Sequence, residues 1–324
     1  MRPIRRVAIT GGAGFIGSHL IDACLDRGFR VAAIDDLSVG RMDFIGEHVR
    51  AGRVRFVRGD ILDAPVLKLA LEGADAVFHL AANPDARRGL EDPRIDLDLE
   101  VLTTFQVLET MRLLGIPRVI FASSGTVYGD VGTAEVSEDY APCRPVSLYG
   151  AGKAAAEAFL SAYSASFGLE AAVCRLGNVI GERATHGALF DFDQKLRRDP
   201  SRLEILGNGQ QAKPYLYVRE LVEAFIFVAL QSGERFDTFN VAPRGATSVA
   251  FLARTLLEEL GLSGTPLLFG ESRVGWTGDI PQSRLNPDKL ARLGWSPGYS
   301  SDEAVKVGVR EFVRHSRAGA VGSR

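Results

Sequence analysis

The sequence predicts an α/β protein whose core is a doubly wound parallel sheet, followed by a smaller and irregular α/β region. Short apolar segments alternate with longer helical patterns through the first half of the 324-residue chain, as they do in βαβ units. These apolar segments show no polar alternation, so we expect both faces of each strand to be buried. A glycine-rich turn joins the first apolar segment to the first helical pattern, which is typical of this fold class.

The predicted strands follow one another along the first half of the chain. Six apolar segments have the length and composition of strands, at 5–10, 29–35, 53–60, 75–82, 118–124 and 170–178. Helical patterns separate them, at 14–28, 63–72, 96–114 and 149–168. Six strands with helices between them are what a Rossmann-type sheet requires.

Beyond the sixth strand, glycines, prolines and charged segments interrupt this rhythm. The pattern there predicts one short strand in TFNVAP and two helices, at 219–231 and 247–261. We therefore expect a Rossmann-type domain over 1–178 and a second domain over 179–316, with a segment near 236–242 returning to the first domain. The small and polar residues 317–324 are expected to form a flexible tail.

Composition and charge exclude several classes of function. The net charge of -2 and the pI near 6.3 provide no basic field for a nucleic-acid backbone. Neither the five histidines nor the cysteines Cys24, Cys143 and Cys174 show metal-ligand spacing, so no metal site is expected. No apolar run approaches the ~20 residues of a membrane span, and no signal-peptide pattern follows the N-terminal arginines. We expect a cytoplasmic protein that binds a small molecule, without a nucleic-acid or membrane partner.

A phosphate-binding loop is predicted directly after the first strand. Gly11, Gly14 and Gly17 are spaced so that the backbone can approach a pyrophosphate at the N-terminus of the following helix. Asp35 closes the second strand, where a carboxylate accepts hydrogen bonds from a ribose hydroxyl and repels a 2′-phosphate, which favours NAD over NADP. Arg41 nearby leaves NADP as an alternative. The competing interpretation is a structural glycine turn with a solvated aspartate.

Further cofactor-binding residues are expected at the same edge of the sheet, where the strands end. Asp60 and Ile61 follow the third strand, where an adenine could rest, and the small Ala81 and Ala82 follow the fourth, where a dinucleotide must pass closely. The other residues expected around the cofactor are Phe15, Ile16, Asp36, Leu37, Ser38, Gly40, Leu80, Tyr149 and Lys153.

Tyr149 and Lys153 form the candidate catalytic pair. They are separated by one helical turn, so both side chains leave the same face of the predicted helix. A neighbouring ammonium and a positively charged nicotinamide would lower the pKa of Tyr149, whose phenolate could then take a proton from a substrate hydroxyl. Ser124, at the end of the fifth strand, could bond the same oxygen. The alternatives are a solvated lysine, a packed tyrosine and, for Ser123 and Ser124, simple turn residues.

Several motifs together resemble extended short-chain dehydrogenases/reductases of the nucleotide-sugar epimerase/dehydratase family, and among these the sequence is most similar to UDP-glucose 4-epimerases. These motifs occur in the family's order: TGGAGFIGSHL, DDLSVG, GDILD, FHLAA, FASSGTVYG, YGAGK, RLGNVIGER and GNGQQAKPYLYV. The resemblance implies that the first domain binds NAD and the second a nucleotide sugar. It also implies a homodimer joined through the helices at 96–114 and 149–168.

The resemblance further implies an isomerase in which Ser124, Tyr149 and Lys153 are catalytic. Such an enzyme inverts C4 of a UDP-glucose or UDP-galactose type of substrate through a transient 4-keto sugar and keeps its NAD. The related 4,6-dehydratases carry an Asp-Glu pair, and decarboxylases a Glu, where this chain has Gly125 and Thr126. Epimerisation is therefore the expected reaction.

The substrate site expected from the resemblance comprises Ser124, Thr126, Asn178, Lys213, Trp276 and Asp279. The sequence departs from the family pattern at three of its landmarks. Lys213-Pro214 replaces the usual Arg-Asp, Trp276 stands where an arginine is common, and Glu100 stands where an asparagine is common. Because lysine is a point charge and arginine a bidentate fork, the first change affects how a diphosphate is held.

Two other functions remain open. One is a net oxidoreductase, such as an NAD(P)-dependent 4-ketosugar reductase or another sugar-alcohol dehydrogenase of the same family, which must exchange its cofactor at every turnover. The other is a non-catalytic dinucleotide sensor on the same fold. The presence of both Tyr149 and Lys153 favours an enzyme over a sensor.

Overall fold

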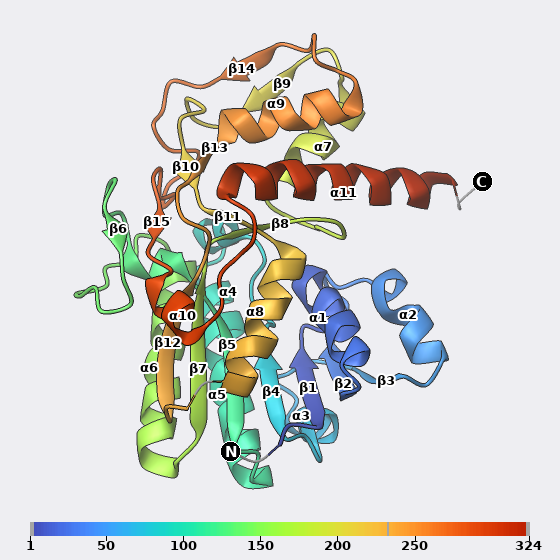
Figure 1. Cartoon of the computed structure of the whole chain (residues 1–324), viewed down its shortest axis with the longest axis vertical. Helices are drawn as coiled ribbons and strands as arrows, with labels where there is room; N and C mark the ends of the chain where they lie inside the picture. Colours follow the sequence, from blue (N-terminus) through green and yellow to red (C-terminus); the bar gives the residue numbers. More distant parts are fainter. Residues whose placement is uncertain (1–2, 232, 322–324) are drawn as a thin grey trace. The chain divides into compact units, whose positions relative to one another are not determined.

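The computed structural model describes residues 3–231 and 233–321 (Figure 1). It divides into two compact units. The first comprises Met1–Val127, Leu148–Arg175 and Val222–Phe239, and the second comprises Tyr128–Ser147, Leu176–Leu221 and Asn240–Arg324. The chain thus passes between the units several times, whereas the sequence predicts one main boundary after residue 178. How these units correspond to binding domains remains a prediction.

A seven-stranded sheet forms the core of the first unit and confirms the predicted doubly wound α/β fold. Its strand order is β12-β7-β5-β4-β1-β2-β3, and the pairings of β1 with β2 and β4, of β2 with β3 and of β4 with β5 are parallel. The strands are β1 (Arg6–Thr10), β2 (Arg30–Asp35), β3 (Val54–Arg58), β4 (Ala76–His79), β5 (Arg118–Ser124), β7 (Glu170–Leu176) and β12 (Phe236–Val241). The direction of winding reverses between β1 and β4, which is where ligands bind in such sheets.

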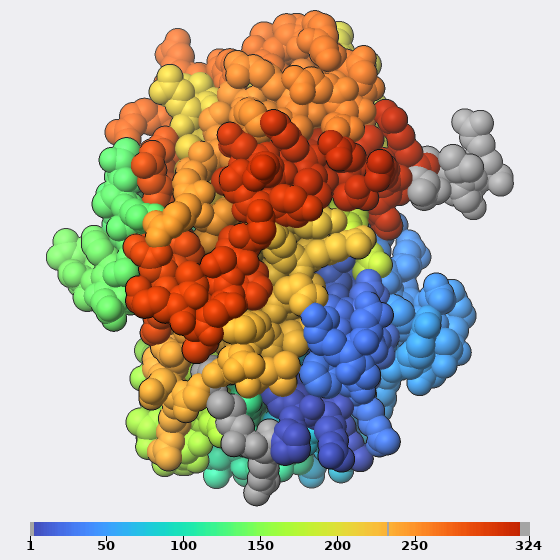
Figure 2. Space-filling view, in the orientation of Figure 1, coloured from blue at the N-terminus to red at the C-terminus, as the bar shows by residue number. Residues whose placement is uncertain are grey.

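Helices cover both faces of this sheet. Helices α3 (Ala64–Leu71), α5 (Thr103–Leu114) and α6 (Leu148–Phe167) share one apolar core with the strands, centred on fully buried residues such as Val77 and Phe121. Helices α1 (Phe15–Asp26) and α8 (Val218–Gln231) lie on the other face, side by side in Figures 1 and 2, and an Arg27–Glu223 ion pair joins them. All four residues of β4 are buried, which explains its uninterrupted apolar sequence.

The predicted helix at 96–114 is interrupted. It consists of α4 (Arg94–Asp96), a π-helical segment η2 (Leu97–Leu102) and α5, which ends at a left-handed Gly115. The wider π-helical turn packs against α6 and presents Glu100 to it. Hydrophobic periodicity does not reveal such a turn, because one extra residue changes the helix face only locally.

Helix α2 (Met42–Arg50), after β2, was not predicted from the sequence. Its apolar contribution to the core is small, since Ile45 is its only fully buried large side chain. The 3-10 segments η1 (Ala86–Leu90) and η3 (Gly125–Tyr128) follow β4 and β5. Among the described residues, no helix has the length and apolarity needed to cross a membrane.

The second unit is built from helices and two-stranded sheets. The predicted helix at 247–261 is confirmed as α9 (Val249–Leu260). The sequence did not predict the other helices described for this unit, which are α7 (Ala188–Arg198), α10 (Asp288–Leu293) and α11 (Ser301–Val321). The expected tail 317–324 falls within α11 as far as Val321, and 322–324 lie outside the described residues. The sequence of residues 317–321 shows no apolar periodicity, so the last turn of α11 could not be predicted from it.

The short strands of the second unit pair across long sequence separations. The pairs are β8 (Asn178–Ile180) with β11 (Tyr215–Tyr217), β10 (Ala212–Lys213) with β13 (Thr247–Ser248), β9 (Leu203–Ile205) with β14 (Leu267–Phe269), and β6 (Glu135–Val136) with β15 (Arg284–Leu285). Helix α11 fixes this assembly, because the Ser301 hydroxyl accepts the Tyr215 N–H at 2.9 Å and bonds Thr247 Oγ1 at 2.6 Å. These contacts hold β10 and β11, and with them Lys213, in place.

Candidate active site

The glycine loop between β1 and α1 has the geometry of a phosphate cradle. Gly11 has a φ of +68°, which favours glycine, and its N–H donates to Ile34 O at 2.9 Å. A Cβ on Gly11 would lie 3.0 Å from Ala81 N, and one on Gly17 would lie 2.1 Å from Gly11 O. Gly14 caps α1 in an extended conformation, so the first backbone N–H groups of the helix point out of its N-terminus.

Asp35 lies beside this loop at the end of β2. Its buried carboxylate accepts the N–H groups of Ala13 at 3.0 Å and Leu37 at 2.9 Å. Burial raises the pKa of Asp35, and the two backbone donors oppose that shift. A Cβ on Gly40 would lie 2.5 Å from the same carboxylate, so this glycine makes room for it. Arg41, the residue that could favour NADP, instead pairs with Asp43 at 2.9 Å.

The other expected cofactor residues are distributed along the same edge of the sheet. Asp60 caps its own turn by accepting the Leu62 N–H at 2.8 Å, and Ile61 is buried. The exposed Asp36 carboxylate accepts the Ser38 N–H at 2.8 Å, which shapes the loop after β2. These side chains border the edge where the parallel strands end, but their hydrogen bonds are local.

His79 anchors the end of β4 and was not singled out from the sequence. Thr10 Oγ1 accepts the N–H groups of Leu80 and Ala81 and lies 2.8 Å from His79 Nδ1, to which it therefore donates. On the other side of the ring, Nε2 lies 3.1 Å from Thr104 Oγ1, whose own proton goes to Glu100 O. This pattern fits a neutral imidazole, and burial, helped by Lys153, lowers the pKa of His79 to about 3.

The two hydroxyls at the end of β5 have different roles. Ser123 donates to Glu157 Oε1 at 2.5 Å, and Glu157 is held in turn by the buried Arg175, with Nη2 2.7 Å from Oε2. Ser124 faces the other way, as consecutive strand residues do, and bonds the Tyr149 phenol oxygen. The pleat of the strand therefore distinguishes the structural serine from the one at the site.

Ser124, Thr126 and Tyr149 form a chain of hydroxyl groups. Thr126 donates to Ser124 Oγ from its N–H at 3.2 Å and from its hydroxyl at 3.0 Å. Because Ser124 accepts both bonds, its own proton is available for the Tyr149 oxygen. Tyr149 lies in the first turn of α6, where the expected helix begins.

Lys153 leaves the same face of α6 as Tyr149 and is almost completely buried. Its Nζ donates to Ala122 O at 2.9 Å and forms an ion pair with Glu100 Oε2 at 2.8 Å. The distance from Nζ to the centre of the Tyr149 ring is 5.7 Å. The ammonium is thus bound to a carboxylate rather than to the phenol.

The charge around Tyr149 corrects one expectation from the sequence. The pKa of Tyr149 is raised well above its ordinary value, first by burial and then by the negative charges of Glu100 and Asp96. The Ser124 hydrogen bond is the one contribution that lowers it. We expected the Lys153 ammonium to lower this pKa, but its charge is compensated by Glu100.

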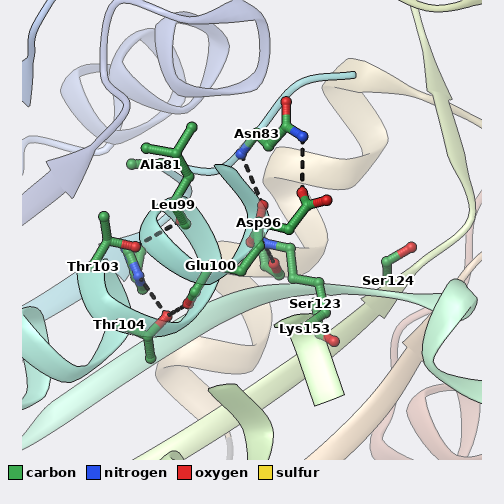
Figure 3. Close-up of polar contacts among 12 residues, drawn as sticks. Ala81, Asn83, Asp96, Leu99, Glu100, Thr103, Thr104, Ser123, Ser124 and Lys153 are labelled. Carbon is green, nitrogen blue, oxygen red and sulfur yellow. Dashed lines mark hydrogen bonds and ion pairs between the residues drawn. The ribbon is translucent and has the colours of Figure 1, made fainter. Parts of the chain in front are cut away.

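Glu100 and Asp96 form an acidic cluster behind Lys153 (Figure 3). Asn83 bridges the two carboxylates, donating from its N–H to Glu100 Oε1 and from Nδ2 to Asp96 Oδ1, both at 2.8 Å. Burial raises the pKa of both acids, that of Glu100 to about 7. Sequence analysis noted Glu100 as a departure but missed Asp96 and Asn83. The signal was present, since the two acids are one helical turn apart.

Four of the expected substrate residues lie together in the second unit. Lys213 Nζ donates to Asp279 Oδ1 at 2.8 Å and to Ile280 O, and the other carboxylate oxygen of Asp279 accepts the Gly275 N–H at 3.0 Å. Trp276 joins this turn through its carbonyl, which accepts the Asp279 N–H at 3.1 Å. Asn178 bonds the Tyr215 phenol, and its N–H donates to Pro214 O at 2.8 Å.

Sequence and structure comparisons identify the family of this chain. The profile of the NAD dependent epimerase/dehydratase family matches residues 7–242. The chain belongs to that family. The UDP-glucose 4-epimerase of Mycolicibacterium smegmatis is 33% identical over 317 residues, which cover 96% of this chain and 99% of the relative.

Solved structures of family members superpose on nearly the whole chain. A UDP-galactose 4-epimerase is 37% identical with a TM-score of 0.85, covering 95% of this chain and 99% of its own. The Thermus thermophilus UDP-glucose 4-epimerase, in complex with NAD, is 31% identical with a TM-score of 0.83, covering 96% and 99%. The matches also include UDP-glucuronic acid decarboxylases and a UDP-N-acetylglucosamine 4-epimerase.

As a member of this NAD-dependent family, the enzyme uses NAD, and its residues fit that cofactor. Gly17 lies directly against the backbone of Gly11, so the loop turns tightly into the N-terminus of α1, where free N–H groups would meet a pyrophosphate. The fixed Asp35 carboxylate would provide the acceptor for a ribose hydroxyl, and the small Ala81 keeps the end of β4 free of bulk.

Proposed function

We propose that this enzyme inverts the configuration at C4 of a UDP-hexose, with UDP-glucose and UDP-galactose as the substrate pair. The observation that carries the proposal is the hydrogen-bonded Ser124–Tyr149 pair, with Thr126 donating into Ser124 and no acidic side chain at residues 125 and 126. Eliminating water from a sugar requires an additional acid and base, and these positions supply neither. Reversible proton and hydride transfer requires only the hydroxyl groups that are present.

In the proposed reaction, Tyr149 takes the proton of the sugar 4-hydroxyl and later returns it. When bound, NAD would supply reversible hydride chemistry at C4, so that the oxidation and the reduction of the sugar balance within one turnover. Ser124 stabilises the sugar oxygen and the phenol oxygen through the hydrogen that its contacts with Thr126 leave available. Inversion follows if the 4-keto sugar presents its other face before the hydride returns.

The second unit supplies the proposed nucleotide site. We assign the diphosphate to Lys213, whose ammonium is held by Asp279, and expect Asn178 and Trp276 to border the same ligand. The usual arginine at this position can contact a diphosphate through two N–H groups, whereas Lys213 carries a single ammonium. Its ion pair with Asp279 fixes where that positive charge lies.

We also propose that the enzyme is a homodimer joined through η2, α5 and α6. Large apolar side chains are exposed along these elements, among them Phe105 at 39% and Phe159 at 38%, whose ring centres lie 6.1 Å apart. Such an exposed apolar surface favours association. Analytical ultracentrifugation is expected to give a dimer that Phe105→Glu converts to a monomer, and a monomeric wild type would contradict the proposal.

The proposed reaction is tested by incubating the purified enzyme with UDP-, dTDP-, GDP- and CDP-sugars and following C4 inversion by NMR. We expect UDP-glucose and UDP-galactose to interconvert without added NADH, with stoichiometric NAD retained. Turnover only with added NADH would instead identify a 4-ketosugar reductase, and no inversion of any sugar would refute the epimerase proposal.

A further inference from the structure

The acidic cluster behind Lys153 is unusual because Glu100, Asp96 and the Tyr149 phenol all lie around one buried cation. Glu100 and Asp96 are each 1% exposed, as is Lys153, and the Tyr149 phenol lies on the same helical face as the lysine. The fit is close: a Cβ on Gly152 would lie 2.8 Å from Glu100 Cβ and 3.0 Å from Asp96 O. The π-helical turn and a glycine of α6 together bring the Glu100 carboxylate to the ammonium.

The charge of Glu100 decides which anion the ammonium stabilises. When Glu100 is ionised, Lys153 Nζ is paired with it at 2.8 Å, while Glu100 and Asp96 both repel a phenolate at Tyr149. When Glu100 carries a proton, Lys153 Nζ no longer has an anionic partner at 2.8 Å, and a phenolate at Tyr149 becomes the favourable partner of the ammonium. A buried charge must be compensated, so the two anions compete for one cation.

We propose that Glu100 is a positioning residue that controls the catalytic base: protonated Glu100 leaves Lys153 free to stabilise the Tyr149 phenolate, and ionised Glu100 withdraws that stabilisation. The inference rests on the proposed function in one respect, the role of Tyr149 as base. It adds a residue that touches neither substrate nor cofactor in this scheme and acts through Lys153.

Among the described residues, few other titratable groups lie close enough to Glu100 to control the charge around Lys153 in its place. From α6 it faces Lys153 and Tyr149, and on its N-terminal side it faces Asp96, which is bonded to Asn83 and influenced by Arg88 of η1. Towards β4 lies His79, which stays neutral. Because burial raises the pKa of Glu100 to about 7, its charge changes in the neutral range.

The test measures Tyr149 ionisation directly in the NAD-loaded enzyme without substrate. Tyrosinate absorbance is recorded against pH for wild type and Glu100→Gln, and the signal of the matching Tyr149→Phe protein is subtracted in each case. Since Gln removes one repelling charge and frees the ammonium, we expect the midpoint to fall by at least about one pH unit, a tenfold change in the ionisation equilibrium. Asp98→Asn is the control. It removes another carboxylate of η2, one that pairs with Arg94, and it is expected to leave the midpoint of Tyr149 ionisation unchanged.

An unchanged or higher midpoint in Glu100→Gln, even with a lowered melting temperature, would reduce Glu100 to a structural residue and overturn the proposal. If Glu100→Gln does not fold, Asp96→Asn decides, with a smaller shift in the same direction expected and no shift overturning the proposal. The absorbance requires no turnover. A failure of C4 inversion therefore refutes the proposed reaction without affecting this measurement, and the reverse also holds.

Discussion

Gly17 and Gly11 approach each other so closely that no side chain fits between them. A Cβ at residue 17 would lie 2.1 Å from the Gly11 carbonyl oxygen and 2.8 Å from the Cα of Gly12. The obstacle is backbone on both counts, so no rotamer change can relieve it. A glycine at residue 17 is thus required by the turn itself, before any ligand is considered.

Gly17→Ala is expected to destabilise the protein by more than about 2 kcal/mol and to weaken NAD binding, because the loop and the start of α1 must separate. Denaturant unfolding and NAD titration measure the two effects. Gly264→Ala is the matched control, since its Cβ meets nothing within 4 Å, and it is expected to change stability by less than about 0.5 kcal/mol. NAD affinity within threefold of wild type in Gly17→Ala would contradict the assigned role of the loop.

Asp35→Ser is expected to narrow the preference for NAD over NADP by at least about tenfold. The carboxylate is fixed by the N–H groups of Ala13 and Leu37 at the end of β2, where we propose that it binds the ribose and would repel a 2′-phosphate. The ratio of the two dissociation constants is the measurement. Asp36→Ser, which removes an exposed neighbouring carboxylate, is expected to leave the ratio unchanged, and equal ratios in both variants would argue against Asp35 as the selecting residue.

Those parts of the fold and site that depend on local sequence could be predicted from it. The parallel strands followed from uninterrupted apolar segments, and the facing of Tyr149 and Lys153 followed from helical periodicity. The two-stranded sheets of the second unit could not be predicted, because a pair such as Glu135–Val136 with Arg284–Leu285 joins very short segments far apart in the chain.

The charge at the site also depended on tertiary contacts. The sequence indicates an ammonium near a phenol, but only the packing of η2 against α6 brings Glu100 to Lys153. Likewise, Ser123 and Ser124 cannot be told apart from the sequence. Ser123 is identified as structural only by its bond to Glu157, which Arg175 holds, and both of these residues are distant in the chain. Charge pairing between residues this far apart in the chain produces no periodic pattern in the sequence.

His79 is expected to make the protein less stable in acid. Its pKa is lowered to about 3 in the folded protein, whereas an unfolded histidine titrates near its ordinary value of 6.5. Below pH 6.5, His79 therefore binds a proton in the unfolded chain but not in the folded protein. As the pH falls, this group lowers the free energy of unfolding by up to about 1.4 kcal/mol per pH unit. Unfolding curves of wild type and His79→Asn between pH 8 and 4 are expected to differ by this slope. Parallel pH dependences would show that His79 does not titrate in this way.

Tyr149→Phe is expected to reduce turnover at least about a hundredfold while NAD remains bound, because it removes the proton acceptor and leaves the ring packing intact. The measurement is kcat together with the NAD content of the purified protein. Tyr163→Phe, which changes another tyrosine of α6 and removes its hydrogen bond to Glu109 of α5, is expected to keep wild-type activity. Full turnover by Tyr149→Phe would eliminate this residue as the base.

Lys213→Met is expected to weaken UDP binding by at least about tenfold, because the partly buried Asp279 carboxylate would then face the diphosphate without its cation. Lys213→Arg keeps the charge and is expected to bind UDP within about threefold of wild type, since Asp279 and the Ile280 carbonyl can hold a guanidinium as well. Calorimetric titration with UDP separates the two variants. If Lys213→Met and Lys213→Arg bind UDP equally well, the ammonium serves only the turn formed by Asp279 and the diphosphate must be held elsewhere.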